Sequence, residues 1–151
     1  MARRSRTVKL LCRLTIKLLD SAAACSMAAN DARGFEFYTI FERRAVERKD
    51  AARHLQRLLT SLRCRPPLQG SLLGAIECFV AHHIHRSTAA ELTILKLFDW
   101  QEVHIVSLFE QLMNEARLSA DVEDVLEYEY KRVSEGYAAL KALEWRLARQ
   151  V

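Results

Sequence analysis

Three residues with metal-binding side chains interrupt the apolar faces of two predicted helices. Glu47 and His54 lie seven positions apart in one helix, so they share a face. Glu102 lies seven positions after Leu95 and seven before Phe109 in another helix, so it shares their apolar face. Bundles that bind iron or manganese project carboxylates and histidines inward from facing helices. We therefore take Glu47, His54 and Glu102 as candidate metal ligands, with iron or manganese as the metal.

The same glutamates have a second interpretation. The dinuclear motif places His three positions after Glu, and neither Glu47 nor Glu102 is followed by His at that spacing. Glu129 also lies on an apolar stripe, and Arg132 stands three positions after it. On this interpretation Glu47 and Glu129 pair with arginines on a solvated flank. Glu102 needs a partner because a buried carboxylate is costly alone, and we expect an internal hydrogen bond to Arg or Tyr.

Four long amphipathic helices are expected to position these residues. Apolar side chains recur at three- and four-residue steps, and the helices are expected over about 7–29, 35–63, 88–116 and 120–148. Gly34, Pro66-Pro67 and Gly70 separate them, a short connector helix is expected over about 71–86, and Ser119 is a candidate N-cap. This order predicts an all-α, single-domain four-helix bundle over residues 1–151, with a crossover segment between two helical hairpins.

Composition and targeting signals narrow the class of protein. Half of the residues are apolar, and only four Gly and two Pro occur, which excludes a disordered chain and an all-β fold. Lys9, Arg13 and Lys17 interrupt the stretch where a secretion signal would need apolar residues, and no window is apolar enough to span a membrane. The four cysteines form no CxxC pair. A cytoplasmic protein with reduced thiols is expected.

A histidine cluster and the missing catalytic motifs bear on activity. His82, His83 and His85 could capture a transition metal, but no Cys or carboxylate lies near enough in sequence to complete a strong site, so adventitious binding or none is expected. No GxSxG, GxGxxG or phosphate loop is present. The sequence therefore favours a non-catalytic protein.

The net charge of +4 conceals two halves of opposite sign. Residues 1–65 carry 15 Lys and Arg against 6 Asp and Glu, a net of +9, whereas residues 66–151 carry 8 against 13, a net of −5. Two hairpins of opposite sign favour docking on each other, or on a second copy. The other interpretation is a free basic face at the N-terminus that binds nucleic acid or an anionic membrane surface.

Several segments together resemble a bacterial ferritin-like four-helix-bundle family of unknown function. They are Ile40-Phe-Glu-Arg-Arg-Ala-Val-Glu-Arg48, His54-Leu-Gln-Arg-Leu-Leu, Gly70-Ser-Leu-Leu-Gly-Ala75 and Ile94-Leu95 leading to Glu102. The resemblance covers about residues 8–148. It implies a ferritin-like bundle with a crossover helix, and no established activity or substrate.

The sequence departs from that family at positions that matter for metal binding. His54 stands where the family tends to carry Glu, Gln101-Glu102-Val103 where it carries Gly-Glu-Asp, and Tyr137 where it carries His. If the family has a carboxylate site, the resemblance retains only Glu47 and Glu102 here. A working di-iron oxidase or an iron store is therefore not expected.

Three functional hypotheses follow. The first is a non-catalytic ferritin-like bundle that acts through self-association, as a dimer, or through a protein partner. The second is a ferritin-like protein that binds iron or manganese through Glu47, His54 and Glu102 in stress or redox handling. The third is a basic N-terminal helix that binds nucleic acid or a membrane surface, which the interleaved acids of the second helix disfavour.

Overall fold

The computed structural model describes residues 2–30, 32, 34–71, 88–115 and 118–150. Four α-helices make up most of this part of the chain, and it contains no β-strand. The helices are α1 (Ala2–Asn30), α2 (Phe35–Ser61), α4 (Thr88–Met113) and α5 (Ala120–Ala148). The all-α prediction is therefore confirmed. The predicted connector helix and the histidine cluster at 82–85 lie outside the described residues, apart from residue 71.

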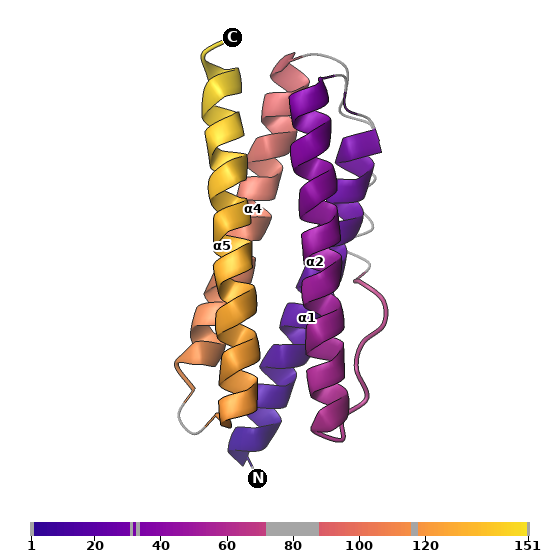
Figure 1. Ribbon diagram of the computed structural model, residues 1–151, viewed down its shortest axis with the longest axis vertical. Coiled ribbons are helices and arrows are strands. Elements are labelled where there is room, and N and C mark those ends of the chain that lie inside the picture. Colours follow the sequence, from indigo (N-terminus) through magenta and orange to yellow (C-terminus); the bar gives the residue numbers. More distant parts are fainter. Residues whose placement is uncertain (1, 31, 33, 72–87, 116–117, 151) are drawn as a thin grey trace.

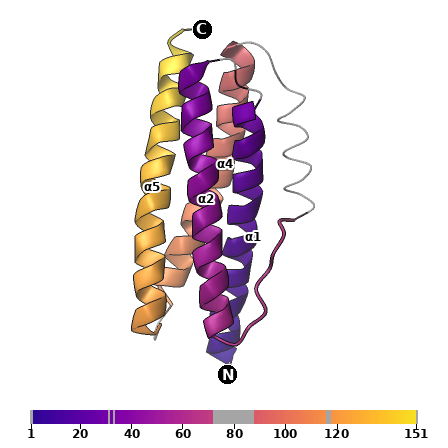
Figure 2. The same cartoon turned by 45° about the vertical axis from the view of Figure 1, so that its right-hand side comes forward.

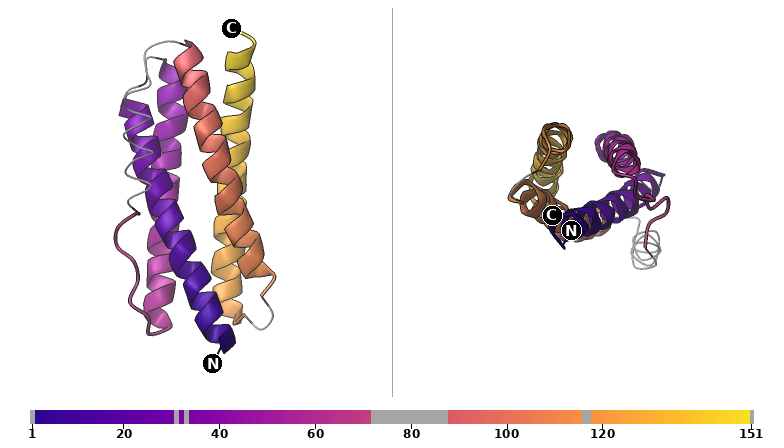
Figure 3. Two further views of the ribbon diagram at one scale, coloured as in Figure 1. Left: turned by 180° about the vertical axis from the view of Figure 1, so that it is seen from behind. Right: turned by 90° about the horizontal axis from the view of Figure 1, so that it is seen from below.

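The helices form two antiparallel hairpins that pack side by side (Figure 1). α1 packs against α2 and α4, and α5 packs against the same two helices, so α1 and α5 are diagonal partners, as are α2 and α4. α2 and α4 run in the same direction, so the connection between them must return along the bundle (Figures 1 and 3). Its described part, residues 62–71, runs back beside α1 (Figure 2).

Two apolar clusters fill the bundle. One contains residues from all four helices near the N-terminus of α1, and the other contains residues from all four helices near the opposite end. Leu14, Leu55 and Phe109 are fully buried in the first, and Phe41 and Cys25 in the second. Each such Leu or Phe contributes about 1.5–3 kcal/mol by leaving water. These clusters supply most of the driving force that docks the hairpins.

A layer of buried polar residues lies between the two clusters. On α1, α2 and α4 these polar positions fall between the residues of the first cluster and those of the second. They are Asp20 and Ser21 on α1, Arg44, Glu47 and Arg48 on α2, and Glu102 on α4. Charged groups are rarely buried unless paired, so this layer is the place to look for a functional site.

The helix ends follow from local sequence, with one difference from expectation. Ser119 is the N-cap of α5, because its hydroxyl accepts a hydrogen bond from the backbone N–H of Val122 at 3.4 Å, as predicted. α1 begins at Ala2 and not near residue 7. The early arginines are good helix formers and no Gly or Pro interrupts them, so the helix extends into the basic stretch. None of the four described helices combines the length and apolar character needed to cross a membrane.

α2 ends in a Schellman motif built on a non-glycine residue. The N–H of Cys64 donates to the carbonyl of Leu59 and the N–H of Arg63 to that of Thr60, both at 2.9 Å. Arg63 has a φ of 59°, the left-handed region in which an L side chain is strained. The motif fixes where the chain leaves α2 and where Cys64 lies.

We expect Arg63→Gly to raise the free energy of unfolding by about 0.5–1 kcal/mol, because glycine adopts this φ without strain and the gain exceeds its cost in chain entropy. Urea unfolding measures the change. The control is Arg65→Gly, two residues on, where φ is not positive and no gain is expected. A less stable Arg63→Gly protein would contradict the assignment of strain.

Candidate functional site

Arg48 is the centre of the buried polar layer. Its side chain is completely buried, and its two terminal nitrogens donate to different carboxylates. Nη1 lies 2.7 Å from Oε1 of Glu47, one residue earlier on α2, and Nη2 donates to Oε2 of Glu102 on α4. Because α2 and α4 are diagonal partners, this guanidinium crosses the middle of the bundle. Arg48 therefore joins the two hairpins by charge.

A second arginine completes the pairing of Glu47. Arg44 lies one turn earlier on α2, and its Nη1 is 3.0 Å from Oε2 of Glu47. Both side chains are more than nine-tenths buried. Gly136 on α5 leaves the space that they occupy: a Cβ there would lie 2.1 Å from Arg44 Nη1 and 2.6 Å from Glu47 Oε1. The glycine is thus required by close approach and not by an unusual backbone angle.

We expect Gly136→Ala to lower the free energy of unfolding by about 1–2 kcal/mol, even though Ala is the better helix former. The added methyl must push Arg44 and Glu47 out of their paired positions, because a Cβ at position 136 would lie within 2.6 Å of both side chains. Chemical denaturation followed by circular dichroism measures the loss. Ser134→Ala on the same helix is the control and is expected to be neutral or slightly stabilising. Equal stability of Gly136→Ala and the parent would contradict this packing.

The pKa values of the polar layer are set by two opposing effects. Burial disfavours the charged form of each group, and a nearby opposite charge favours it. Burial lowers the pKa of Arg48, but the carboxylates of Glu102 and Glu47 outweigh it, so its pKa is raised and it stays charged. Burial raises the pKa of Glu47, although Arg48 and Arg44 oppose this. Cys25, completely buried on α1 beside the layer, has its pKa raised by burial to about 12. It is therefore an unreactive thiol.

A separate buried pair lies further toward the N-terminal end of α1. Glu129 on α5 is completely buried, and its Oε1 bonds to Nδ1 of His54 on α2. The His54 side chain is 38% exposed, so one edge of the ring reaches solvent while the other faces the carboxylate. The second oxygen of Glu129 has no hydrogen-bond partner among the described residues. This pair links the two hairpins at a second level.

The structure separates the three candidate ligands. Glu47 and Glu102 meet at the Arg48 guanidinium, whereas His54 binds Glu129. Within the described ranges, no three His, Cys, Asp or Glu side chains gather in a way that could hold a metal ion. The hydrogen bond predicted between Glu102 and an internal Arg is confirmed.

The predicted solvated flank is wrong. Glu47 does pair with arginines, but all of these side chains are buried. Glu129 pairs with His54 and not with Arg132, and it too is buried. The expectation failed for Glu47 because α2 carries many charged residues, and their spacing alone does not show which of them face the interior of the bundle.

Sequence reasoning missed the role of Asp20, the acid in the middle of α1. It is buried, and its carboxylate accepts hydrogen bonds from the backbone N–H of Ser71 at 2.7 Å and from the Ser71 hydroxyl at 2.6 Å. A Cβ on Gly70 would lie 2.1 Å from Asp20 Oδ1, so glycine is needed here as well. The signal was the single acid among apolar neighbours of α1 together with the Gly-Ser pair. Asp20 anchors the returning segment to the bundle.

Ion pairs at the surface also join the two hairpins. Besides the buried pairs, Arg6 lies 2.9 Å from Glu115 and Arg146 pairs with Glu36. The first joins the basic stretch of α1 to the residues after α4, and the second joins α5 to α2. The first pair joins a base of the basic half to an acid of the acidic half, whereas the second has the opposite sense.

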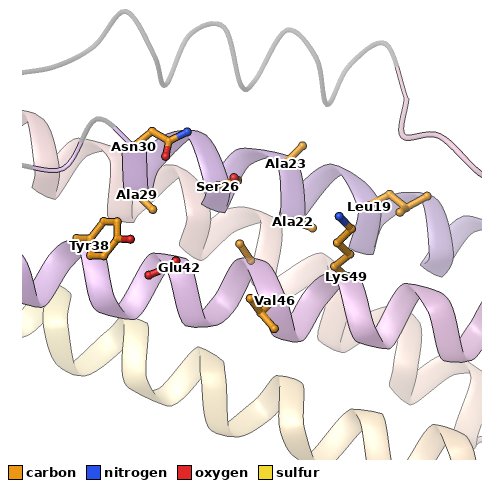
Figure 4. Close-up of a pocket in the computed structure, with 11 residues that line it drawn as sticks. Leu19, Ala22, Ala23, Ser26, Ala29, Asn30, Tyr38, Glu42, Val46 and Lys49 are labelled. Atoms are coloured by element: carbon orange, nitrogen blue, oxygen red, sulfur yellow. The ribbon is translucent and has the colours of Figure 1, made fainter.

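A surface groove between α1 and α2 is the other concave feature of interest (Figure 4). It has a volume of about 470 Å³, and small or apolar residues such as Ala22, Ala23 and Val46 line most of it. Its charged groups are Glu42 and Lys49, and a hydrogen bond from Tyr38 to Glu42 raises the pKa of Tyr38. A single carboxylate and a single amine do not make a metal site or a nucleophile with its base. The groove is suited to apolar contact.

Comparison with known proteins identifies no family for this chain. No protein-family model matches the sequence, and no curated protein matches it.

Proposed function

We propose that this protein is a non-catalytic ferritin-like helical bundle that acts by self-association, as a dimer, with a protein partner as the alternative mode. The observation that carries the proposal is the internal pairing of the candidate ligands. Arg48 and Arg44 occupy the carboxylates that a metal would need, and they supply the positive charge that a metal would bring. The charges of the site are therefore used to hold the hairpins together.

The arrangement of the helices supports the ferritin-like part of the proposal. Two antiparallel hairpins joined by one long return connection are the arrangement of ferritin-like bundles. Here α2 and α4 run in the same direction and residues 62–71 start the return beside α1. The resemblance of residues 8–148 to a ferritin-like family points the same way.

Exposed apolar side chains on α4 support the association part. Leu97, Trp100 and Val103 follow one another at three-residue steps and are 44%, 55% and 50% exposed. Three large apolar residues on one side of a helix exceed the scattered exposure that is usual on a monomer. Tryptophan is also the residue type most enriched at interface centres. We assign this face of α4 to the dimer contact.

Size-exclusion chromatography with light scattering tests the dimer. A concentration-dependent dimer is expected for the parent, and Trp100→Lys is expected to shift the protein to the monomer at every concentration. Trp145→Lys, which changes an exposed tryptophan on α5, is the control and should leave the dimer intact. A parent that is a strict monomer would contradict self-association, and so would a Trp100→Lys protein that dimerises like the parent.

The competing proposal is a ferritin-like protein that binds iron or manganese in stress or redox handling. One observation favours it: an oxygen of Glu102 and an oxygen of Glu129, both completely buried, have no hydrogen-bond partner among the described residues. Anaerobic titration of Fe²⁺ and Mn²⁺ by calorimetry separates the two proposals. We expect no binding heat. Stoichiometric heat that disappears in Glu102→Ala would replace the first proposal with this one.

A further inference from the structure

Two free thiols lie at the place where α1 passes the end of α2. Cys12 is on α1 and Cys64 is in the second position after the C-cap of α2. Both are half-buried, and both pack against the same apolar cluster, the one that contains Leu14 and Leu59. A thiolate at Cys64 raises the pKa of Cys12, after the larger effect of burial.

The local structure holds Cys64 in this position. The Schellman motif fixes its backbone through the hydrogen bond from its N–H to the Leu59 carbonyl. Its thiol also donates to the carbonyl of Leu62 at 3.5 Å. Pro66 and Pro67 follow closely and restrict the chain that leaves it. Cys64 is thus presented by rigid backbone on both sides.

An open cavity gives small molecules access to Cys12. Its volume is about 590 Å³, and Cys12 and Ile16 of α1 form one wall. The segment that directly follows Cys64, residues 65–69, forms the other wall. The cavity therefore confirms from geometry that the chain beyond Cys64 lies against the turn of α1 that carries Cys12.

We infer that Cys12 and Cys64 are a redox-active thiol pair, which forms a reversible intramolecular disulfide when a low-molecular-weight disulfide enters this cavity and so fastens α1 to the segment that follows α2.

The chemistry is two successive thiol–disulfide exchanges. The thiolate of Cys12, which lines the cavity, attacks one sulfur of the small disulfide, which gives a mixed disulfide and releases one small thiolate. The Cys64 thiolate then attacks the Cys12 sulfur, which forms the Cys12–Cys64 bond and releases the second small thiolate. The two protons lost by the cysteines end on the two small thiols, and the small disulfide takes up the two electrons.

The third described cysteine provides an internal contrast. Cys25 is completely buried, and its pKa of about 12 keeps it protonated and unreactive. Oxidation should therefore select the pair at the end of α2.

Mass spectrometry after oxidation tests the pair. The parent for the test is full-length Cys78→Ser, because the tryptic peptide that carries Cys64 continues through Arg86 and would otherwise contain a second cysteine. After treatment with oxidised glutathione, a non-reducing digest is expected to contain the peptide Leu10–Arg13 joined to Cys64–Arg86. The oxidised protein should also melt about 5–10 °C higher, since the bond closes a long loop. Dithiothreitol should reverse both changes.

The matched controls are Cys12→Ser and Cys64→Ser in the same background, with folding checked by circular dichroism. Each should lose the cross-linked peptide and the rise in melting temperature. Three results would overturn the inference: glutathione attached to Cys12 or Cys64 without the cross-link, a cross-link between two copies of the chain, or a cross-link that involves Cys25.

Discussion

Arg48→Met is expected to lower the free energy of unfolding by about 3–5 kcal/mol. Methionine keeps an unbranched apolar stem but ends short of the guanidinium, so the loss combines the unpaired charge with a small cavity. Removal of the guanidinium leaves Glu102 completely buried with no described partner and leaves Glu47 with Arg44 alone. A buried carboxylate without a counter-charge costs more than the pair itself contributes. Urea unfolding at pH 7 measures the effect.

Two further variants show whether charge pairing is the cause. Arg53→Met removes an arginine whose side chain is 57% exposed on the same helix, and a change within about 0.5 kcal/mol is expected. The double variant Arg48→Met with Glu102→Leu removes both charges of the diagonal pair and should recover most of the stability. If Arg48→Met alone unfolds with the same midpoint as the parent, the diagonal pair does not hold the hairpins together.

His54→Ala is the second large effect, with an expected loss of about 2–4 kcal/mol. The reason is the asymmetry of the pair: Glu129 is completely buried, whereas His54 reaches solvent. Loss of the histidine leaves the buried carboxylate of Glu129 without its partner. Loss of the carboxylate in Glu129→Leu leaves a half-exposed imidazole ring that can bond to water instead. The free energy of unfolding of that variant should therefore fall by less than about 1 kcal/mol.

Thermal and chemical unfolding of the two variants measure this asymmetry. The control is His104→Ala, which removes an exposed histidine of α4 whose ring lies against Trp100, and it should be nearly neutral. The double variant His54→Ala with Glu129→Leu should be more stable than His54→Ala alone. Equal losses in His54→Ala and Glu129→Leu would contradict the assignment of Glu129 as the buried member.

The helices were predictable because their signals are local. Apolar spacing located all four, Ser119 marked the start of α5, and the low Gly and Pro content excluded an all-β fold. Glu102 was also predictable as a buried acid, since its neighbours at seven-residue distances are apolar. Such inferences need only the rotation of a residue relative to its own helix.

The partners of the buried acids were not predictable in this way. Arg48 stands among several Arg and Lys of α2, and in such a stretch the inward face is defined only by what packs against it. His54 and Glu129 are 75 residues apart, and Asp20 and Ser71 are 51 apart. Each pairing depends on how two hairpins dock, which the spacing within one helix does not specify. Arg48 was for this reason absent from the candidate site residues.

The polar layer between the two apolar clusters, together with the separate His54–Glu129 pair, also determines which alignment of the helices is stable. Apolar residues repeat along each helix, so a hairpin displaced by one repeat would still bury apolar side chains against its neighbour. It would, however, carry Arg48 away from Glu102 and His54 away from Glu129, and leave charges buried alone. Two pairs at different heights cannot both be rebuilt after such a slip. We therefore expect these buried pairs to destabilise misaligned hairpins more than they stabilise the native alignment.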